Sequence, residues 1–231
     1  MPVICICCAY AQNPVADTTT FKESLKTARA LYLSTVKENY ALYNGGEYGK
    51  KQGDINGFPF FESPGMLKGS VYYKDNWYSD LNLQFDITSE QIVIQDYQKN
   101  NLIALQNERI PEFIIDGHSF FRLDNSASLN GNGYYEKLCS GSLTLWVKRI
   151  KKMELSAKNE DHTTRFKEFD SYYIQKERTF YSFNNERSLL RLLEKKKTEI
   201  KKYISQQDIS FKHDFENAAL KIVLFYNQVA N

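Results

Sequence analysis

Residues 69–97 read GSVYYKDNWYSDLNLQFDITSEQIVIQDY, and a strict alternation of apolar and polar side chains runs through the middle of this stretch. The apolar positions are Leu81, Leu83, Phe85 and Ile87, and the polar positions are Asn82, Gln84, Asp86 and Thr88. A period of two is typical of a half-buried β-strand. Strand-like runs at 71–73 and 92–94 flank it across short polar segments, so the stretch predicts an antiparallel meander of three strands.

The pattern of short strands and turns continues after the meander. Asp116-Gly117 is a strong signal for a tight hairpin, because both residue types tolerate a positive φ. Ser140-Gly141 and Lys176-Glu177-Arg178 indicate the turns of two further hairpins. The strands expected on this basis are 102–105, 113–115, 118–123, 134–138, 142–155, 172–174 and 179–183.

Helical periodicity occurs near both ends of the chain. Thr20 and Glu23 match a capping box, and Gly45 with Gly46 can end a helix, so a long helix is predicted over 21–44. Apolar residues at helical spacing predict a helical pair over 186–229. The expected fold is α+β and mainly β. It is a curved antiparallel meander of about eight to ten strands over 69–183, open-barrel or sandwich-like, with one N-terminal and two C-terminal helices packed on it.

Composition indicates a globular chain with a substantial core. The 231 residues are 42% hydrophobic and 25% charged, which is enough apolar material to bury a core without disulfides. The formal net charge is +2, which argues against nucleic acid as a general polyanionic partner. The apolar run within the first eleven residues is too short to span a bilayer, and no later stretch is long and apolar enough to suggest a transmembrane segment.

The first eleven residues, MPVICICCAYA, predict a signal peptide. The short apolar run ends in Ala9-Tyr10-Ala11, a small-x-small cleavage pattern, but no basic residue precedes it, so we expect the true start to lie upstream. Residues 12–231 would then form a single exported domain. Cys5 and Cys8 have C-x-x-C spacing but lie inside this segment, and only Cys139 would remain after cleavage, which excludes an intramolecular disulfide.

Three histidines each have an aspartate close by in sequence: Asp116 and His118, Asp161 and His162, and His213 and Asp214. A catalytic zinc site needs about three converging protein ligands. These pairs are far apart in sequence and two lie in predicted turns, so we interpret the histidines as solvated turn residues and predict no metal site. No cofactor-binding fingerprint is present, and no cofactor is expected.

Acidic side chains on the predicted strands leave a hydrolase possible. Two carboxylates at a suitable separation suffice for glycoside hydrolysis, and Asp80, Asp86, Glu90, Asp96 and Glu112 are the candidates. The spacing does not select a pair, so an enzymatic activity is not the favoured interpretation. The lysines at 195–197, 201 and 202 are interpreted as a solvated helix face rather than as a membrane or nucleic-acid patch.

Aromatic side chains give the best functional lead. Adjacent rings recur along the predicted strands, and neighbours on a strand point to opposite faces, so some rings should be exposed. Exposed rings form platforms for sugars or for a protein partner. The candidate ligand-binding residues are Phe58, Phe60, Phe61, Trp77 and Tyr78.

Short segments spread along the chain carry a resemblance to a known family. They are Leu42-Tyr43-Asn44-Gly45 with Glu47-Tyr48, Gly69 with Val71-Tyr72-Tyr73, Leu83 with Phe85-Asp86-Ile87, and the run from Tyr172-Tyr173-Ile174 through Arg187-Ser188-Leu189-Leu190 to Lys195-Lys196-Lys197. On these positions the chain resembles an uncharacterised family of exported cell-envelope proteins common in Bacteroidota. The resemblance implies an envelope location, and no catalytic residue can be transferred because the family has no assigned activity.

The favoured hypothesis is a non-enzymatic cell-envelope protein that binds another protein or a glycan through an aromatic sheet face or loop. One alternative is a periplasmic carrier of a lipid or other apolar ligand in a curved-sheet cavity. The other is a glycan-directed hydrolase with a carboxylate pair. The expected location is the periplasm or the periplasmic side of the outer membrane.

Overall fold

The computed structural model describes residues 22–28, 41–49, 55–96, 101–124, 128–155 and 164–230. The chain divides into two compact units, Met1–Ala41 and Leu42–Asn231. In the first unit residues 22–28 are helical, within the range predicted for the N-terminal helix, and Thr27 Oγ1 donates a hydrogen bond of 2.9 Å to the Glu23 carbonyl. The predicted signal segment, residues 1–11, lies outside the described residues.

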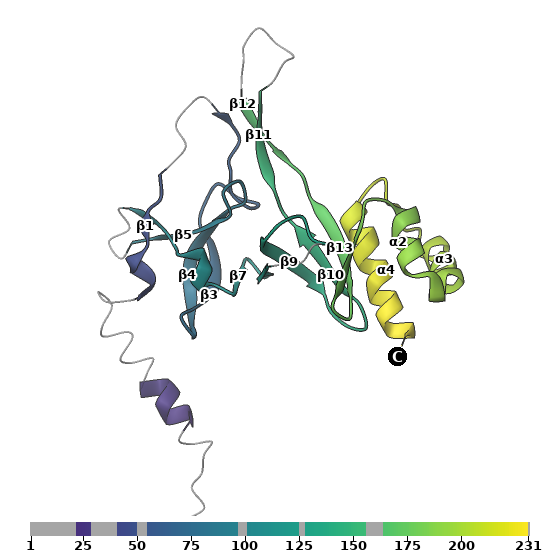
Figure 1. Ribbon diagram of the computed structural model, residues 1–231, viewed down its shortest axis with the longest axis horizontal. Coiled ribbons are helices and arrows are strands. Elements are labelled where there is room, and N and C mark those ends of the chain that lie inside the picture. Colours follow the sequence, from purple (N-terminus) through teal and green to yellow (C-terminus); the bar gives the residue numbers. More distant parts are fainter. Residues whose placement is uncertain are drawn as a thin grey trace, which may run out of the picture. The chain divides into compact units, whose positions relative to one another are not determined.

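The second unit contains an open antiparallel sheet of eleven strands (Figure 1). This confirms the prediction of a mainly β fold built on an antiparallel meander. In spatial order the strands are β1 (Gly46–Glu47), β6 (Leu102–Ala104), β5 (Gln91–Gln95), β4 (Asn76–Asp86), β3 (Leu67–Tyr73), β7 (Glu112–Ile115), β8 (His118–Leu123), β9 (Gly133–Cys139), β10 (Thr144–Lys148), β13 (Ser171–Lys176) and β14 (Thr179–Phe183).

Tight turns set the register of the hairpins. Asp116 and Gly117 join β7 to β8 with φ of 48° and 83°, as the Asp-Gly signal predicts. Lys74 and Asp75 join β3 to β4 with φ of 47° and 63°. Both central residues of each turn are left-handed, which matches the right-handed twist of the strands that the turn connects.

A second sheet of three strands departs from the prediction. The single strand expected over 142–155 is interrupted after Lys148, and β11 (Lys151–Leu155) pairs with β12 (Thr164–Glu168) rather than with β9. The short strand β2 (Ile55–Asn56) then pairs with β12 in parallel. At the interruption, the Phe169 amide donates a hydrogen bond of 2.8 Å to the Ile150 carbonyl, so residues 149–150 and 169–170 lie opposite each other. We call this segment the ribbon break.

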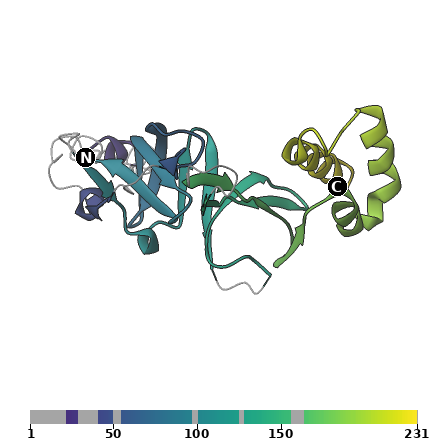
Figure 2. The same ribbon diagram turned by 90° about the horizontal axis from the view of Figure 1, so that it is seen from above.

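The C-terminal region contains more helices than the predicted pair. The described residues form α2 (Glu186–Leu192), a 3₁₀ turn (Glu194–Lys196), α3 (Lys197–Gln206) and α4 (Phe215–Val229). The first predicted helix is therefore interrupted near Leu193, and Lys196, the N-cap residue of α3, makes no side-chain capping hydrogen bond. Figure 2 shows α2, α3 and α4 gathered beside the strands that end with β14. Among the described residues no helix is both long and apolar enough to cross a membrane.

Several groups of apolar side chains form the core of the second unit, among them a small cluster of Tyr135, Trp146 and Tyr173. Under the helices, buried residues of β10, β13 and β14 pack against α2 and α4. Examples are Leu145 and Ile174 on the strands and Leu189 and Val223 on the helices. Between β3 and β9 the core is aromatic. The Phe113 and Phe120 rings stack at a centroid distance of 4.9 Å, and both rings contact Phe85 edge-on at 5.0 and 5.2 Å.

The alternation that predicts β4 is only partly reflected in burial. Leu83, Phe85 and Ile87 are buried as predicted, but Gln84 and Asp86 are buried too. Asp86 Oδ2 accepts hydrogen bonds of 2.8 Å from Tyr48 Oη and 2.6 Å from Ser89 Oγ, while Oδ1 accepts from the Thr88 and Ser89 amides. The carboxylate is therefore satisfied inside the fold and fixes the β4–β5 turn.

Gly69 is the position where β3 tolerates no side chain. A Cβ there would overlap the Ile114 carbonyl oxygen and lie 2.6 Å from Leu83 Cδ1. We predict that Gly69→Ala destabilises the protein by about 1–3 kcal/mol, because the backbone of β7 must move. Gly46→Ala in β1 is the matched control, since a Cβ there meets nothing within 4 Å. Urea denaturation of both variants checks this, and equal midpoints for the two would contradict it.

Candidate functional site

Arg149 lies at the ribbon break and binds carboxylates from two neighbouring elements. Its Nε donates a hydrogen bond of 2.7 Å to Glu136 on β9, and its Nη1 donates one of 2.7 Å to Asp170, which precedes β13. The Arg149 and Glu136 side chains are only 12% and 2% exposed. The ribbon break positions this pair. Arg149 directly follows β10 and Asp170 directly precedes β13, so the two residues lie opposite each other where the ladder between these strands ends.

A third carboxylate reaches Arg149 from helix α4. Glu216 binds the guanidinium in a bidentate manner, with Nη1 and Nη2 donating at 2.7 and 2.9 Å. Tyr172 Oη also donates to Glu216 at 3.0 Å. Glu216 lies in the first turn of α4, where a negative charge favourably meets the helix dipole, and Asp214 caps this turn by accepting from the Asn217 amide at 2.9 Å.

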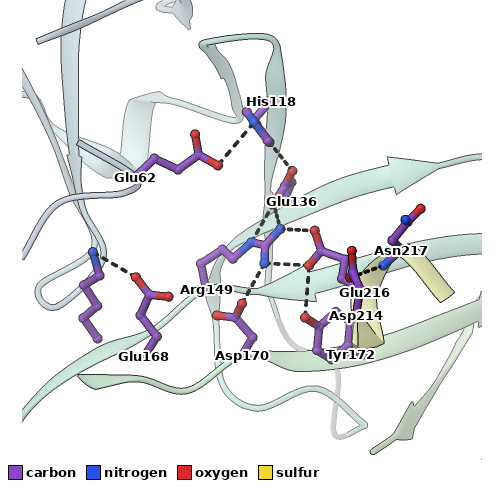
Figure 3. Close-up of polar contacts among 11 residues, drawn as sticks. Glu62, His118, Glu136, Arg149, Glu168, Asp170, Tyr172, Asp214, Glu216 and Asn217 are labelled. Atoms are coloured by element: carbon purple, nitrogen blue, oxygen red, sulfur yellow. Dashed lines mark hydrogen bonds and ion pairs between the residues drawn. The ribbon is translucent and has the colours of Figure 1, made fainter. Parts of the chain in front are cut away.

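His118 extends these contacts toward the loop before β3. Its Nδ1 lies 2.6 Å from Glu136 Oε1 and its Nε2 lies 3.5 Å from Glu62 Oε1, so a carboxylate faces each ring nitrogen (Figure 3). Glu136 thus bridges His118 and Arg149. We call Arg149, Glu136, Asp170, Glu216, Tyr172 and His118 the Arg149 cluster, and Figure 3 shows its members converging from β8, β9, β13, α4 and the ribbon break.

Negative charge exceeds positive charge in this cluster. Burial raises the pKa of the Asp170 carboxyl above its ordinary 3.8, and Arg149 only partly opposes this because it is shared with Glu216 and Glu136. Burial and the nearby Glu216 raise the pKa of the Tyr172 hydroxyl. Burial would lower the pKa of Arg149, but the hydrogen bonds to Glu216 and the charges of Glu136 and Asp170 raise it. Arg149 therefore stays charged while Asp170 accepts a proton more readily than an exposed aspartate.

An open depression of about 510 Å³ lies beside Asp170, and we call it the Asp170 depression. It forms because β14 ends at Phe183 opposite Tyr172, so Ser171 pairs with Lys148 of β10 and has no β14 residue on its other side. Half-buried Tyr172 and Phe215 contribute aromatic wall, with ring centroids 4.8 Å apart. The remaining lining is mostly small and polar: Asn130, Ser171, Ser182, Asn184 and Ser188, with Asp170, Tyr173 and Phe183.

Two further open depressions differ from it in charge. One, of about 580 Å³, is the Tyr72 depression, in which Lys74, Arg109 and Arg122 are balanced by Asp75, Glu108 and Asp124. The other, of about 500 Å³, is the Arg165 depression, which is lined by Lys151, Arg165 and Lys167 with Glu168, Gly57, Phe58 and Phe166. Only the second of these has an excess of one sign of charge.

The five rings predicted as ligand-binding residues lie in different surroundings. Phe61 is buried and contacts Phe120 edge-on at 5.2 Å, and Phe60 packs against Tyr48 at 6.0 Å. Trp77 is 45% exposed and lies 5.5 Å from the ring of Tyr72, while Tyr78 contacts Tyr73 at 6.5 Å. Phe58 lies under Lys151 Nζ at 4.3 Å and lines the Arg165 depression. Of the five, Phe58 lines one of the depressions described above, and Trp77 packs on Tyr72, which lines another.

The acidic candidates from the sequence are mostly engaged in structure. Asp86 is buried and hydrogen-bonded at the β4–β5 turn, Glu90 is ion-paired with Lys148, and Asp96 accepts from Asn101 Nδ2 at 3.2 Å. Asp80 is exposed with φ of 59°, and Glu112 lies on β7. None of the five lines the Asp170 depression. The carboxylates of the Arg149 cluster were not among the candidates.

The histidine interpretation is corrected at one position. His118 is half-buried on β8 and bonded to Glu136, rather than a solvated turn residue beside Asp116. His213 is exposed in a turn as predicted, and His162 lies outside the described residues. Within the described ranges no group of three or more His, Cys, Asp or Glu side chains could hold a metal ion. Cys139 is a free thiol, and burial raises its pKa.

Glu136 is the residue of the Arg149 cluster that the sequence could have revealed. Glu136 lies two residues after Tyr134 on β9, so both side chains point to the same face of the sheet, and Glu136 places a charge at an inward-facing position. Such a charge is almost never buried without a partner.

Comparison of the chain with protein-family models, with curated proteins and with solved structures gave no match.

We predict that Arg149→Met destabilises the protein by about 3–5 kcal/mol, because it leaves three carboxylates without their cation. Arg178→Met in the exposed β13–β14 turn is the control and should change stability by less than about 0.5 kcal/mol. The free energy of unfolding in urea measures both. Glu216→Gln in the Arg149→Met background should recover part of the lost stability. Equal stability of Arg149→Met and Arg178→Met would contradict the assignment.

Asp170 predicts a pH dependence of definite sign. Its pKa is higher in the folded than in the unfolded protein, so the folded state binds more protons above pH 3.8 and Asp170 makes stability fall as the pH rises. Asp170→Asn removes this contribution. The stability of the variant relative to the wild type should therefore increase between about pH 3 and pH 6. Thermal or urea unfolding at several pH values measures the difference, and a constant difference would refute the stated shift.

Proposed function

We propose that this chain is a non-enzymatic cell-envelope protein that binds a glycan in the Asp170 depression. The lining of that depression is the observation that carries the proposal. Half-buried rings of Tyr172 and Phe215 offer apolar surface to the face of a sugar ring, and short hydroxyl and amide side chains surround them. Serine and asparagine supply both donors and acceptors at fixed positions, as sugar hydroxyls require.

The rigidity of the wall also supports this proposal. Tyr172 is held by Glu216 at 3.0 Å, and Phe215 packs against Phe183 at 5.9 Å and Phe211 at 5.5 Å. The rings therefore lose little conformational freedom when a ligand binds. An exported location would bring the depression into contact with envelope polysaccharides, in keeping with the signal segment and the family resemblance inferred from the sequence.

Direct binding to neutral oligosaccharides tests the proposal. The full chain is titrated calorimetrically with soluble oligosaccharides selected on a glycan array. Ser182→Trp fills the depression from β14 and should weaken binding at least about tenfold. Tyr181→Trp is the matched control, because Tyr181 is exposed on the opposite face of the same strand and does not line the depression.

Three outcomes would count against the proposal. Binding that Ser182→Trp leaves unchanged would place the glycan elsewhere. If the chain binds extended peptides and binds no oligosaccharide, a protein partner would be favoured. Shortened oligosaccharides, detected by mass spectrometry and lost in Asp170→Asn, would favour the hydrolase alternative, which the raised pKa of Asp170 in an open depression makes worth testing. The carrier alternative has less support, since the depressions described above, and a smaller one of about 200 Å³ beside Asp208 and Lys221, are open and have polar or charged lining.

A further inference from the structure

We propose that the glycan is acidic and that Lys137 binds its carboxylate on an aromatic surface of the large sheet, which rests on the proposed function and adds the class of sugar. Four side chains form this surface, and we call them the Lys137 platform. They are Phe121 on β8, Lys137 on β9, Trp146 on β10 and Phe180 on β14.

The strand register places these four side chains on one face of the sheet. Lys137 is opposite Trp146, and Phe121 is opposite the residue two positions before Lys137. Phe180 is opposite the residue that lies two positions after the β13 partner of Trp146. Leu145, the neighbour of Trp146, packs under the helices and therefore lies on the other face. The platform is thus on the face of the sheet that points away from α2 and α4.

The three rings of the platform converge. The ring centroid of Trp146 lies 5.7 Å from that of Phe121 and 6.4 Å from that of Phe180, although β8 and β14 are each two strands away from β10. Strands two apart in a flat sheet are separated by about 9–10 Å, so the rings lean toward Trp146. Trp146 is 6% exposed and its Nε1 donates to Gln175 Oε1 at 2.8 Å, so it forms a fixed floor between the half-buried Phe121 and Phe180.

Lys137 adds a positive charge to this aromatic surface. Its Nζ lies 3.8 Å from the Phe121 ring centroid and 5.5 Å from the Trp146 ring, in cation–π contact with both. Within the described ranges its side chain has neither an ion-pair nor a hydrogen-bond partner. The buried lysines of β10 and β11, in contrast, are each paired with a glutamate. The rings hold the Lys137 ammonium group in place and leave its N–H donors available to a ligand.

This combination of charge and rings selects the chemistry of the ligand. A carboxylate accepts charge-assisted hydrogen bonds from an ammonium group. The apolar face of a sugar ring packs on the half-buried rings of Phe121 and Phe180. A uronic acid carries both features on one ring, so it meets Lys137 and an aromatic side chain at the same time.

The platform is continuous with the Asp170 depression. Ser182, which lines the depression, lies two residues after Phe180 on β14 and therefore on the same face. Tyr173, directly opposite Trp146, also lines the depression. An oligosaccharide of several sugars can therefore occupy both surfaces. Its carboxylate is expected at the platform, because the excess negative charge of the Arg149 cluster disfavours an anion beside Asp170.

A glycan array that pairs uronate-containing oligosaccharides with their carboxyl-reduced forms, followed by calorimetric titration of the hits, tests this in the full chain. The acidic form should bind at least about tenfold more tightly than the reduced form. Lys137→Met removes the charge and keeps an apolar side chain over the rings, so it should weaken binding of the acidic form about tenfold. It should leave the reduced form within about twofold, which also shows that the variant is folded. Lys176→Met, an equal charge change at an exposed position of β13, is the control and should leave both affinities within about twofold.

The possible outcomes separate the carboxylate site from the proposed function. Equal affinities of the acidic and reduced forms, or equal effects of Lys137→Met and Lys176→Met, would overturn the carboxylate site. The proposed function would stand in that case if Ser182→Trp still weakens binding. Loss of acidic binding in Lys137→Met with no effect of Ser182→Trp would support the carboxylate site and count against the Asp170 depression. No binding of either form would overturn both.

Discussion

The second unit depends on the satisfaction of one buried guanidinium. Arg149 has five N–H donors and no acceptor, so burying it at the ribbon break requires carboxylates from several directions. Glu136 comes from β9, Asp170 from the opposite strand of the break, and Glu216 from α4. The same side chain thus fixes where the strands leave the large sheet and where the first turn of α4 lies against it. Removal of any one carboxylate leaves the other two on the guanidinium, but removal of the guanidinium leaves all three carboxylates without their shared cation.

Short strands create two of the open depressions. Because β14 ends opposite Tyr172, the start of β13 is open on one side and the Asp170 depression forms there. Because β2 ends opposite Arg165, the Arg165 depression forms beside β12. Sheet edges are otherwise sites of unwanted pairing, and short edge strands limit that risk.

The ribbon break has a buried ionic group on each side, Arg149 with its carboxylates and Lys151 with Glu168. Asp170 belongs both to the Arg149 cluster and to the wall of its depression, so the excess negative charge of the cluster is felt there. Lys151 lies on the other side of the break, two residues after Arg149, and its ammonium group is held by the Phe60 carbonyl and by Glu168.

The sequence predicted features that depend on local chemistry. The alternation in β4, the Asp-Gly turn and the helical stripe of α4 each involve neighbouring residues, and the structure has them where expected. The ribbon break was missed because residues 148–152 contain no Gly, Pro, Asn or Asp to mark a turn, and only the pairing of β11 with β12 reveals it. The Arg149 cluster was missed because its members are spread over almost a hundred residues. Burial of Gln84, Asp86 and Glu136 shows that a polar residue on a strand can face inward when a partner is provided elsewhere.

Native-state hydrogen exchange at increasing urea concentration tests most directly whether Arg149 unites the helix with the sheet. The account predicts that amides of β9, β10, β13 and the first turns of α4 open together, with one free energy and one denaturant dependence. Exchange of α4 as a separate unit, at a clearly lower free energy than β10 and β13, would contradict it.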